Sequence, residues 1–206
     1  MSQSPLLQPV VFLDRDGTLN VELGYIRELE RLVLIDGACQ SVRRLNQAKV
    51  AAVLVTNQTG AARGYYPESH IQALNERLCR LLKDGGAYLD DMYYCPHLRE
   101  GDVAPYNVSC HCRKPETGMI EKAFADHTQF DRARSFVIGD KSTDVELAHN
   151  AGAKGILVST GYGEAVMKGK YQWQVEPDFQ ADSIVEAVEW ILGQLKIDQD
   201  ASERSK

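Results

Sequence analysis

Short apolar runs alternate with stretches of helical periodicity along most of the chain. Continuous apolar runs are typical of strands buried on both faces, and they predict strands over residues 10–13, 51–55, 92–94, 136–138 and 155–159. Apolar residues three and four positions apart predict helices over residues 38–48, 67–81, 116–127, 144–151 and 184–195. Strands that alternate with helices imply βαβ units with right-handed crossovers, so we expect an α/β fold on a parallel sheet.

The domain organisation is simple. No internal repeat and no linker rich in Pro or Gly divides the chain, so the sequence predicts a single domain over residues 1–195. Residues 196–206 are polar and charged, a composition that predicts a disordered tail. No apolar stripe is evident outside the predicted core, and we therefore expect a monomer.

The charge balance narrows the class of partner. The 206 residues include 23 Lys and Arg against 29 Asp and Glu, a formal net charge of −6. Binding to nucleic acids or membrane surfaces depends on clustered positive charge, so neither partner is expected. A small phosphorylated metabolite stays possible, because charge in a pocket can oppose the net charge. No apolar run approaches the ~18 residues of a membrane span, and residues 1–9 lack a secretory-signal pattern, so we expect a cytoplasmic protein.

Polar segments follow three of the predicted strands. Residues 14–18 read Asp-Arg-Asp-Gly-Thr, residues 56–58 read Thr-Asn-Gln, and residues 139–141 read Gly-Asp-Lys. Each segment alone fits a helix cap or a turn. Ligands of parallel sheets bind beyond the carboxyl ends of the strands, so the three segments together predict one ligand site.

A second cluster combines three of the five cysteines with a histidine: Cys95, His97, Cys110 and Cys112. In a reducing compartment, such crowding favours a metal over disulfides. Three thiolates and one imidazole would close a tetrahedral Zn²⁺ site, which is typical of a structural metal. Two alternatives stay open: buried cysteines that behave as small apolar residues, and His111 as the fourth ligand. The loop 95–112 ends directly before Arg113 and Lys114, so a zinc ion there would position both cations.

The polar segments, in their order, resemble the motifs of the haloacid-dehalogenase-like phosphohydrolases. The segment Asp-Arg-Asp-Gly-Thr-Leu after the first strand is similar to motif one, and Val-Thr-Asn-Gln at 55–58 to motif two. Arg-Lys-Pro at 113–115 resembles motif three, and Gly-Asp-Lys-Ser-Thr-Asp at 139–144 resembles motif four. The resemblance implies a Rossmannoid three-layer sandwich with a central, mostly parallel sheet. It also implies that the motif-two and motif-four strands flank the motif-one strand.

The resemblance assigns roles to residues at these motifs. Asp14 would be the nucleophile that forms an aspartyl-phosphate, and Asp16 the general acid and base. Thr56 and the Asn57 backbone would hold phosphoryl oxygens, and Lys114 would neutralise charge in the transition state. The expected ligands of a catalytic Mg²⁺ are the Asp14 carboxylate, the Asp16 carbonyl and Asp140, with Asp144 orienting metal-bound water.

The Cys-x-His and Cys-x-Cys pairs before Arg-Lys-Pro resemble a small group within this family. The group contains heptose bisphosphate phosphatases and histidinol-phosphate phosphatases, and segments such as Leu-Gly-Tyr at 23–25 and Gly-Asp-Lys at 139–141 look more like the former. The resemblance therefore implies hydrolysis of the 7-phosphate of a heptose 1,7-bisphosphate. Of its two anomers, we expect the β anomer to be the substrate. Histidinol-phosphate hydrolysis is the alternative, and a non-catalytic zinc-stabilised binding module is the alternative of another class. Glu22-Leu23 and Thr59 depart from the heptose pattern, which bears on fine substrate contacts.

The chain leaves no room for a separate cap domain, because only 39 residues separate Asp16 from Thr56 and a strand and a helix use most of them. Substrate recognition would then depend on short loops at 20–30 and 59–66 and on the cysteine loop. A phosphate that is not cleaved needs cations, and the candidates are Arg113, Lys141 and Arg63. Two alternatives stay open: Arg63 as a solvated loop charge, and Lys141 as a solvated lysine near the metal. The candidate substrate contacts are Glu22, Gly24, Tyr25, Asn57, Gln58, Thr59, Arg63, Arg113 and Lys141.

Overall fold

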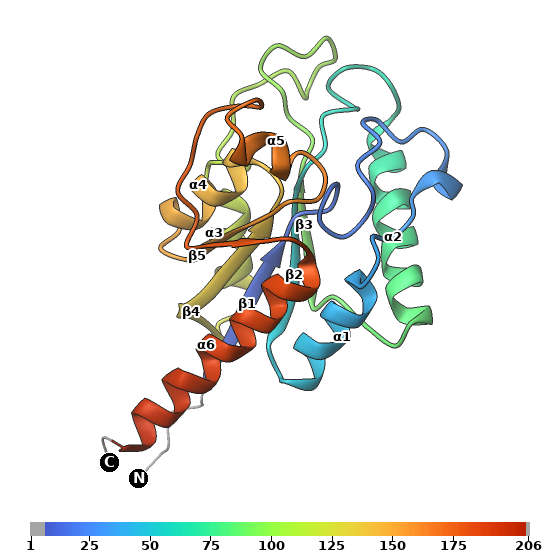
Figure 1. Cartoon of the computed structure of the whole chain (residues 1–206). Helices are drawn as coiled ribbons and strands as arrows, with labels where there is room; N and C mark the ends of the chain where they lie inside the picture. The colour runs from blue at the N-terminus through green and yellow to red at the C-terminus, as the bar shows by residue number, and fades with distance from the viewer. Residues whose placement is uncertain (1–6, 205–206) are drawn as a thin grey trace.

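Six strands form one parallel sheet at the centre of the molecule (Figure 1). The computed structural model describes the backbone of residues 7–204 and the side chains of residues 7–196. The strands are β1 (Gln8–Leu13), β2 (Ala51–Asn57), β3 (Asp91–Cys95), β4 (Phe130–Gly139), β5 (Lys154–Val158) and β6 (Phe179–Ala181). Their order is β3-β2-β1-β4-β5-β6, and every neighbouring pair is parallel.

Helices cover both faces of the sheet. They are α1 (Ala38–Gln47), α2 (Glu68–Asp84), α3 (Gly118–Asp126), α4 (Ser142–Asn150), α5 (Gly163–Met167) and α6 (Ile184–Arg204), together with the 3-10 turn η1 (Leu29–Arg31). Alternate residues of β1 point to opposite faces, since Val11 and Leu13 pack with α1, α2 and α6, whereas Val10 and Phe12 pack with α3 and α4. The result is the expected three-layer sandwich.

The predicted order of elements is confirmed, with three additions. All five predicted strands and all five predicted helices are present, and most of their bounds agree with the prediction within about three residues. Strand β4 begins at Phe130 where the prediction began at 136, and α6 ends at Arg204 where the prediction ended at 195. The sequence analysis missed η1, α5 and β6, each of five residues or fewer, because so short a segment carries too little periodicity to be recognised.

The structure also differs from the prediction at the tail that was expected to be disordered. Helix α6 continues to Arg204, so the backbone of 196–204 is helical where the polar composition predicted disorder. The segment lacks Gly and Pro and contains Lys, Gln, Glu and Arg, which are good helix formers, so it extends the helix that the core-facing stripe begins. Residues 205–206 lie outside the described part of the chain.

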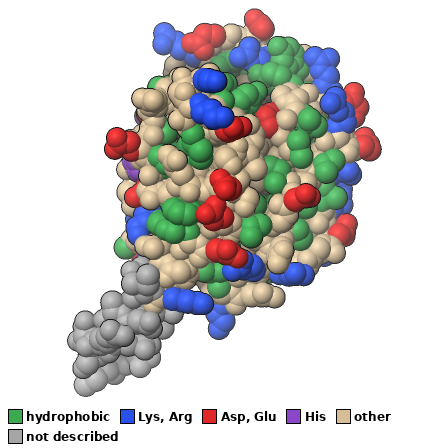
Figure 2. Space-filling view, viewed as in Figure 1, with side chains coloured by type: hydrophobic (Ala, Val, Ile, Leu, Met, Phe, Trp, Pro, Cys, Tyr) green, Lys and Arg blue, Asp and Glu red, His purple; other side chains and the backbone are tan. Residues whose placement is uncertain are grey.

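Within residues 7–204, no separate cap domain stands over the carboxyl ends of the strands, as the sequence predicted. Loops and the N-terminal ends of α4 and α5 surround this end of the sheet. None of the helices described is long and apolar enough to cross a bilayer. On the face that Figure 2 shows, acidic and basic side chains are interspersed without a broad basic surface.

Candidate active site

The order of the sheet brings the three polar segments together. Strand β1 lies between β2 and β4, and Leu13 is in register with Leu54 of β2 and Ile138 of β4. Asp14, Thr56 and Asp140 follow these positions by one or two residues, so they meet at the carboxyl edge. The chain crosses from one side of β1 to the other here, which is where ligands of open parallel sheets bind.

A cavity of about 190 Å³ opens at this edge, and most of the predicted site residues line it. Its lining includes eleven predicted residues and two that were not predicted, Thr143 and Tyr162. The eleven are Asp14, Asp16, Glu22, Gly24, Tyr25, Thr56, Asn57, Gln58, Thr59, Lys114 and Lys141. Four residues predicted for this site are not part of this lining: Arg63, Arg113, Asp140 and Asp144.

Lys114 is buried between two carboxylates. Its ammonium group lies 2.9 Å from Asp14 Oδ1 and 2.6 Å from Asp144 Oδ1, and it donates a third bond to the carbonyl of Val55 at 3.0 Å. Burial alone would lower the pKa of Lys114, but the charges of Asp14 and Asp144 outweigh it and raise the pKa above its ordinary value. Burial alone would raise the pKa of Asp14, whereas the ammonium groups of Lys114 and Lys141 hold it below the usual range. Asp14 and Lys114 are therefore both charged.

Asn57 fixes the backbone that carries Lys114. Its side-chain oxygen accepts a hydrogen bond from the Lys114 N–H at 3.0 Å, and its amide group donates to the Lys114 carbonyl at 3.2 Å. The end of β2 thereby sets the position of the motif-three lysine. The Asn57 side chain is occupied by these two hydrogen bonds. Any hydrogen bond from Asn57 to a ligand would therefore come from its backbone.

Lys141 faces the oxygen atoms that a cation would bind. Its Nζ lies 2.8 Å from Asp140 Oδ1, 3.3 Å from Glu22 Oε2, 3.4 Å from the Asp16 carbonyl oxygen and 3.8 Å from Asp14 Oδ2. These oxygens come from four different positions in the loops after β1 and β4. The arrangement shows that a positive charge is favoured at this point of the cavity.

The donor set fits a divalent cation with oxygen ligands. Carboxylate oxygens of Asp14, Asp140 and Asp144 lie within 4.8 Å of one another, and all three residues are buried. Burial raises the pKa of Asp140 to about 7 despite the opposing charge of Lys141, and the neighbouring charges of Asp14 and Asp144 add to the rise. Five carboxylates at the site face three cations, Arg15, Lys114 and Lys141, so one divalent ion would balance the remaining charge.

The carboxylate of Asp16 points away from this cluster and is held by hydrogen bonds. Arg15 Nη2 lies 3.0 Å and Gln58 Nε2 2.7 Å from Asp16 Oδ2, and Asn20 Nδ2 lies 3.0 Å from Asp16 Oδ1. Only the Asp16 carbonyl faces the proposed metal position. The geometry thus separates a carbonyl ligand from a carboxylate that is available for proton transfer.

Two glycines allow the loops to approach Asp140 closely. Gly17 has φ +83° and Gly161 has φ +58°, and a Cβ on either would collide with the Asp140 carboxylate. Thr160 Oγ1 ties these loops together through a hydrogen bond to the Gly17 carbonyl at 2.6 Å. The loop after β5, which the sequence analysis did not single out, therefore completes the cavity.

The rim of the cavity carries Tyr25, Thr59 and Arg63. The Tyr25 hydroxyl lies 3.1 Å from Thr59 Oγ1, and the guanidinium of Arg63 lies 5.9 Å from the centre of the Tyr25 ring. Arg63 is exposed at this rim. Arg113 instead donates to the His97 carbonyl at 3.2 Å and borders a neighbouring depression of about 290 Å³ with Arg99.

The four predicted zinc ligands converge beside the active site. The Sγ atoms of Cys95, Cys110 and Cys112 lie 3.1–3.5 Å apart, and His97 Nδ1 lies 3.3 Å from Cys112 Sγ. Bonds of about 2.3 Å to a tetrahedral zinc require edges of about 3.8 Å, so small adjustments would let all four bind one ion. The His111 side chain is exposed and outside the cluster.

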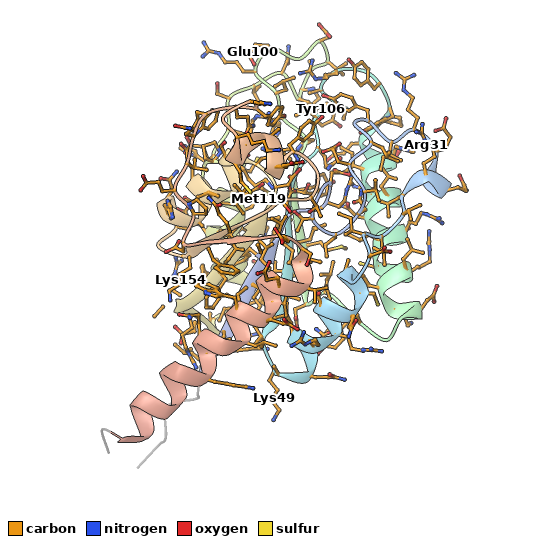
Figure 3. The ribbon with its side chains drawn as sticks, viewed as in Figure 1. Arg31, Lys49, Glu100, Tyr106, Met119 and Lys154 are labelled. Atoms are coloured by element: carbon orange, nitrogen blue, oxygen red, sulfur yellow. The ribbon has the colours of Figure 1, made fainter. Side chains whose placement is uncertain are left out.

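The cysteine loop also contacts helix α2 and the loop after β2. Tyr94 and Tyr106 donate their hydroxyl groups to the two oxygens of Glu68, both at 2.9 Å. The N–H groups of Asp102 and Val103 bond to the Ala62 carbonyl at 2.7 and 3.0 Å. Figure 3 places Tyr106 and Glu100 of this loop in the upper part of the molecule, where the loops gather. The cluster thus supports both the motif-three lysine and the rim.

Some residues of the site were missed by sequence reasoning. Arg15, Asn20 and Asn75 form the surroundings of Asp16, and Thr143 and Tyr162 line the cavity. Thr143 lies within the motif-four segment. Tyr162 follows the end of β5, so the same rule that singled out three strand ends could have found it. Asn75 offered no signal beyond being polar among apolar residues of a helix face.

Comparison with known proteins agrees with this geometry. Residues 111–187 match the family model described as HAD-hydrolase-like. The D-glycero-D-manno-heptose-1,7-bisphosphate 7-phosphatase of Thermosynechococcus vestitus is 50% identical over 192 residues, covering 91% of this chain and 97% of that relative. The D-glycero-beta-D-manno-heptose-1,7-bisphosphate 7-phosphatase of Escherichia coli K12 is 43% identical over 155 residues, covering 74% and 80%.

Among solved structures, the D,D-heptose 1,7-bisphosphate phosphatase of B. bronchiseptica, complexed with magnesium and phosphate, is similar with a TM-score of 0.80 and 28% identity. The match covers 91% of this chain and 99% of that one. The sheet order and the carboxylates at its switch point define a haloacid-dehalogenase-like hydrolase, which confirms the resemblance of the motifs. Within that class, the chain belongs to the family of D-glycero-D-manno-heptose-1,7-bisphosphate 7-phosphatases.

Proposed function

We propose that the protein hydrolyses the 7-phosphate of D-glycero-β-D-manno-heptose 1,7-bisphosphate and releases inorganic phosphate and the heptose 1-phosphate. The observation that carries the proposal is the convergence of Asp14, Asp16 and Lys114 on one cavity, in a chain 50% identical to a heptose bisphosphate phosphatase. The product would supply nucleotide-activated heptose for the lipopolysaccharide core. A cytoplasmic monomer is the form in which we propose that it acts.

The reaction would proceed in two steps. A carboxylate oxygen of Asp14 attacks phosphorus, the bond between phosphorus and the sugar oxygen breaks, and Asp16 gives its proton to the leaving alkoxide. Asp16 then takes a proton from water, whose oxygen attacks the aspartyl-phosphate. That attack releases phosphate and restores the Asp14 carboxylate, so protons and atoms balance over the cycle.

The remaining residues hold the phosphoryl group and its charge. Thr56 and the Asn57 backbone would bind phosphoryl oxygens, and Lys114 would remain beside the reacting carboxylate. A magnesium ion bound by the Asp14 carboxylate, the Asp16 carbonyl and Asp140 would supply positive charge against the phosphate, with Asp144 orienting its water ligands. A zinc ion bound by Cys95, His97, Cys110 and Cys112 would be structural, because all four positions are filled.

Substrate choice would rest on the exposed rim, since no separate cap domain covers the cavity within residues 7–204. Tyr25, Thr59 and Glu22 would contact the sugar. Lys141 and Arg63 would hold the phosphate that is not cleaved, and Arg113 would do so only after leaving the His97 carbonyl.

A substrate panel tests the proposal. Phosphate release is measured from both anomers of the heptose bisphosphate, from histidinol phosphate and from fructose bisphosphate, with ³¹P NMR identifying the phosphate that remains. We expect the highest kcat/KM for the β anomer and a product that retains the 1-phosphate. A preference for histidinol phosphate would establish the alternative activity, and no release from any substrate would favour a binding module.

A further inference from the structure

Asn75 lies on the buried face of α2, although its neighbours on that face are apolar. It is 3% exposed, and Ile71, Leu74 and Leu78 around it are fully buried. A buried amide is costly unless it is hydrogen-bonded. Its side-chain oxygen accepts a hydrogen bond from Arg15 Nη1 at 3.0 Å, so this amide serves a residue of the active-site loop.

Arg15 links Asn75 to the site. Its side chain is 1% exposed, and its second terminal nitrogen, Nη2, lies 3.0 Å from Asp16 Oδ2 and 2.7 Å from Gln58 Oε1. A guanidinium is planar and rigid, so fixing Nη1 on Asn75 also fixes the direction of Nη2. Asn75 therefore fixes the orientation in which the Arg15 guanidinium binds Asp16 and Gln58.

The same contact orients the Gln58 amide. Because Gln58 Oε1 accepts from Arg15, its Nε2 is directed to Asp16 Oδ2 at 2.7 Å and to Thr56 Oγ1 at 3.2 Å. Asn20 Nδ2 holds the other Asp16 oxygen at 3.0 Å. The Asp16 carboxylate is thus fixed on its inner side, and its 13% exposed remainder faces the cavity.

We infer that Asn75 is a positioning residue, which acts through Arg15 and Gln58 to aim the Asp16 carboxylate for proton transfer. The inference rests on the proposed function in taking Asp16 as the proton donor and acceptor. Asn75 itself is not among the residues that line the cavity, so it would not contact substrate. Proton transfer depends on the direction and distance of the donor, whereas attack by Asp14 depends on the Lys114 ammonium group and on the backbone N–H of Arg15. Asn75 is hydrogen-bonded to neither of these groups, because it meets Arg15 only at the guanidinium.

The test compares leaving groups. Asn75→Leu keeps the branched shape of the side chain and removes the acceptor, and Asn75→Asp keeps an acceptor at the same place. An alkyl leaving group needs a proton, while p-nitrophenolate leaves without one. For Asn75→Leu we expect kcat on the heptose bisphosphate and on glycerol phosphate to fall roughly 10- to 100-fold with KM nearly unchanged. Formation of the first p-nitrophenol per site in rapid-mixing experiments should change less than threefold.

A slower second step should also be visible. If Asp16 is misaimed, hydrolysis of the aspartyl-phosphate slows, and p-nitrophenyl phosphate should show a burst approaching one product per site. Asn75→Asp should restore the wild-type ratio of alkyl to aryl activity. Leu78→Ala, a truncation of the same helix face at a residue that offers Arg15 no hydrogen-bond acceptor, is the control for loss of packing and should keep the wild-type ratio.

Several results would overturn the inference. They are an equal loss in the rate of the first turnover on both leaving groups in Asn75→Leu, no rescue by Asn75→Asp, or the same shifted ratio in Leu78→Ala. If Asn75→Leu does not fold, Asn75→Ala carries the same expectations. Failure of the proposed function is seen separately, because a wild-type enzyme that rejects the heptose bisphosphate but hydrolyses glycerol phosphate and p-nitrophenyl phosphate still permits the comparison.

Discussion

Single side chains at the strand ends are held in defined contacts by other residues of the chain. Lys114 directs its ammonium group at Asp14, Asp144 and the Val55 carbonyl, and Asp14 Oδ1 also accepts the Arg15 N–H at 2.7 Å. Such a preorganised carboxylate needs little reorganisation in order to react, which is how polar sites stabilise transition states. Asp14, the proposed nucleophile, is therefore the residue whose replacement should reduce the activity most.

Replacing Asp14 by Asn removes the nucleophile with almost no change in shape. We expect phosphatase activity to fall roughly 1,000-fold or more, because the amide does not form the phosphoenzyme. Phosphate release is measured with the best substrate of the panel, and rapid quenching with labelled substrate looks for the phosphoenzyme. Asp36→Asn, an acidic residue outside the cavity, is the control. Normal hydrolysis by Asp14→Asn would contradict the assigned mechanism.

At the scale of elements, the loops and helices that follow the strands hold the site residues in place. Strand β3 leads into the cysteine loop, which contacts α2 through Glu68 and the loop after β2 through Ala62. At the opposite end of β3, Asp91 accepts a hydrogen bond from Tyr93 and lies 2.7 Å from His127 Nε2, just after α3. One strand therefore has a functional end and a structural end.

The functional end is tested with Cys112→Ser. We expect the zinc content to fall from about one per chain to near zero and the melting temperature to drop. The value of kcat should fall roughly tenfold, since Lys114 follows the cluster by two residues and loses its support. Metal analysis, thermal unfolding and steady-state kinetics provide the readouts. Cys79→Ser, a cysteine outside the cluster, should behave as wild type; equal zinc in both variants would contradict the ligand set.

The contacts of Asp91 at the structural end of β3 predict that the stability of the fold depends on pH. Burial alone would raise the pKa of Asp91, but hydrogen bonds from His127 and Tyr93 outweigh it and hold the pKa below its ordinary value of 3.8. A folded-state pKa below the unfolded one stabilises the fold above about pH 4, and this contribution disappears as the pH falls through the folded value. Asp91→Asn should thus lose roughly 0.5–1 kcal/mol at pH 7, an amount limited by the half-exposed carboxylate.

Urea unfolding of wild type and Asp91→Asn at pH 7, 5 and 3 measures the difference. It should shrink toward pH 3. Glu116→Gln, which alters an exposed carboxylate, is the control and should show little difference at any pH. A deficit of Asp91→Asn that stays constant over the range would show that the Asp91 charge does not contribute.

At the scale of the whole molecule, periodicity predicted what repeats and missed what does not. Buried strands such as 51–55 can be predicted from their continuous apolar sequence, and known motifs located Asp14 and Asp140 without coordinates. The orientation of Arg113 toward the His97 carbonyl and the role of Asn75 depend on contacts between residues far apart in the chain. A single sequence contains no local signal for such contacts.

Two large hydrophobic cores pack against opposite faces of the one sheet. Ile191 of α6 lies in the core on one face and Ile120 of α3 in the core on the other, and both are fully buried. Because alternate residues of the same strands face the two cores, neither face can lose its packing without affecting the other. This predicts that the chain unfolds as a single domain.

The prediction is tested by truncating each core in turn. Ile191→Ala and Ile120→Ala should each cost about 2–5 kcal/mol, which lowers the melting temperature by several degrees. Trp190 stacks on Phe179 at 4.9 Å, so its fluorescence, recorded in a Trp173→Phe background, reports the first face. Hydrogen exchange in α3 reports the second. Either truncation should shift both midpoints equally, because the sheet couples the faces; a variant that lowers the α3 midpoint and leaves that of Trp190 in place would show two independent units.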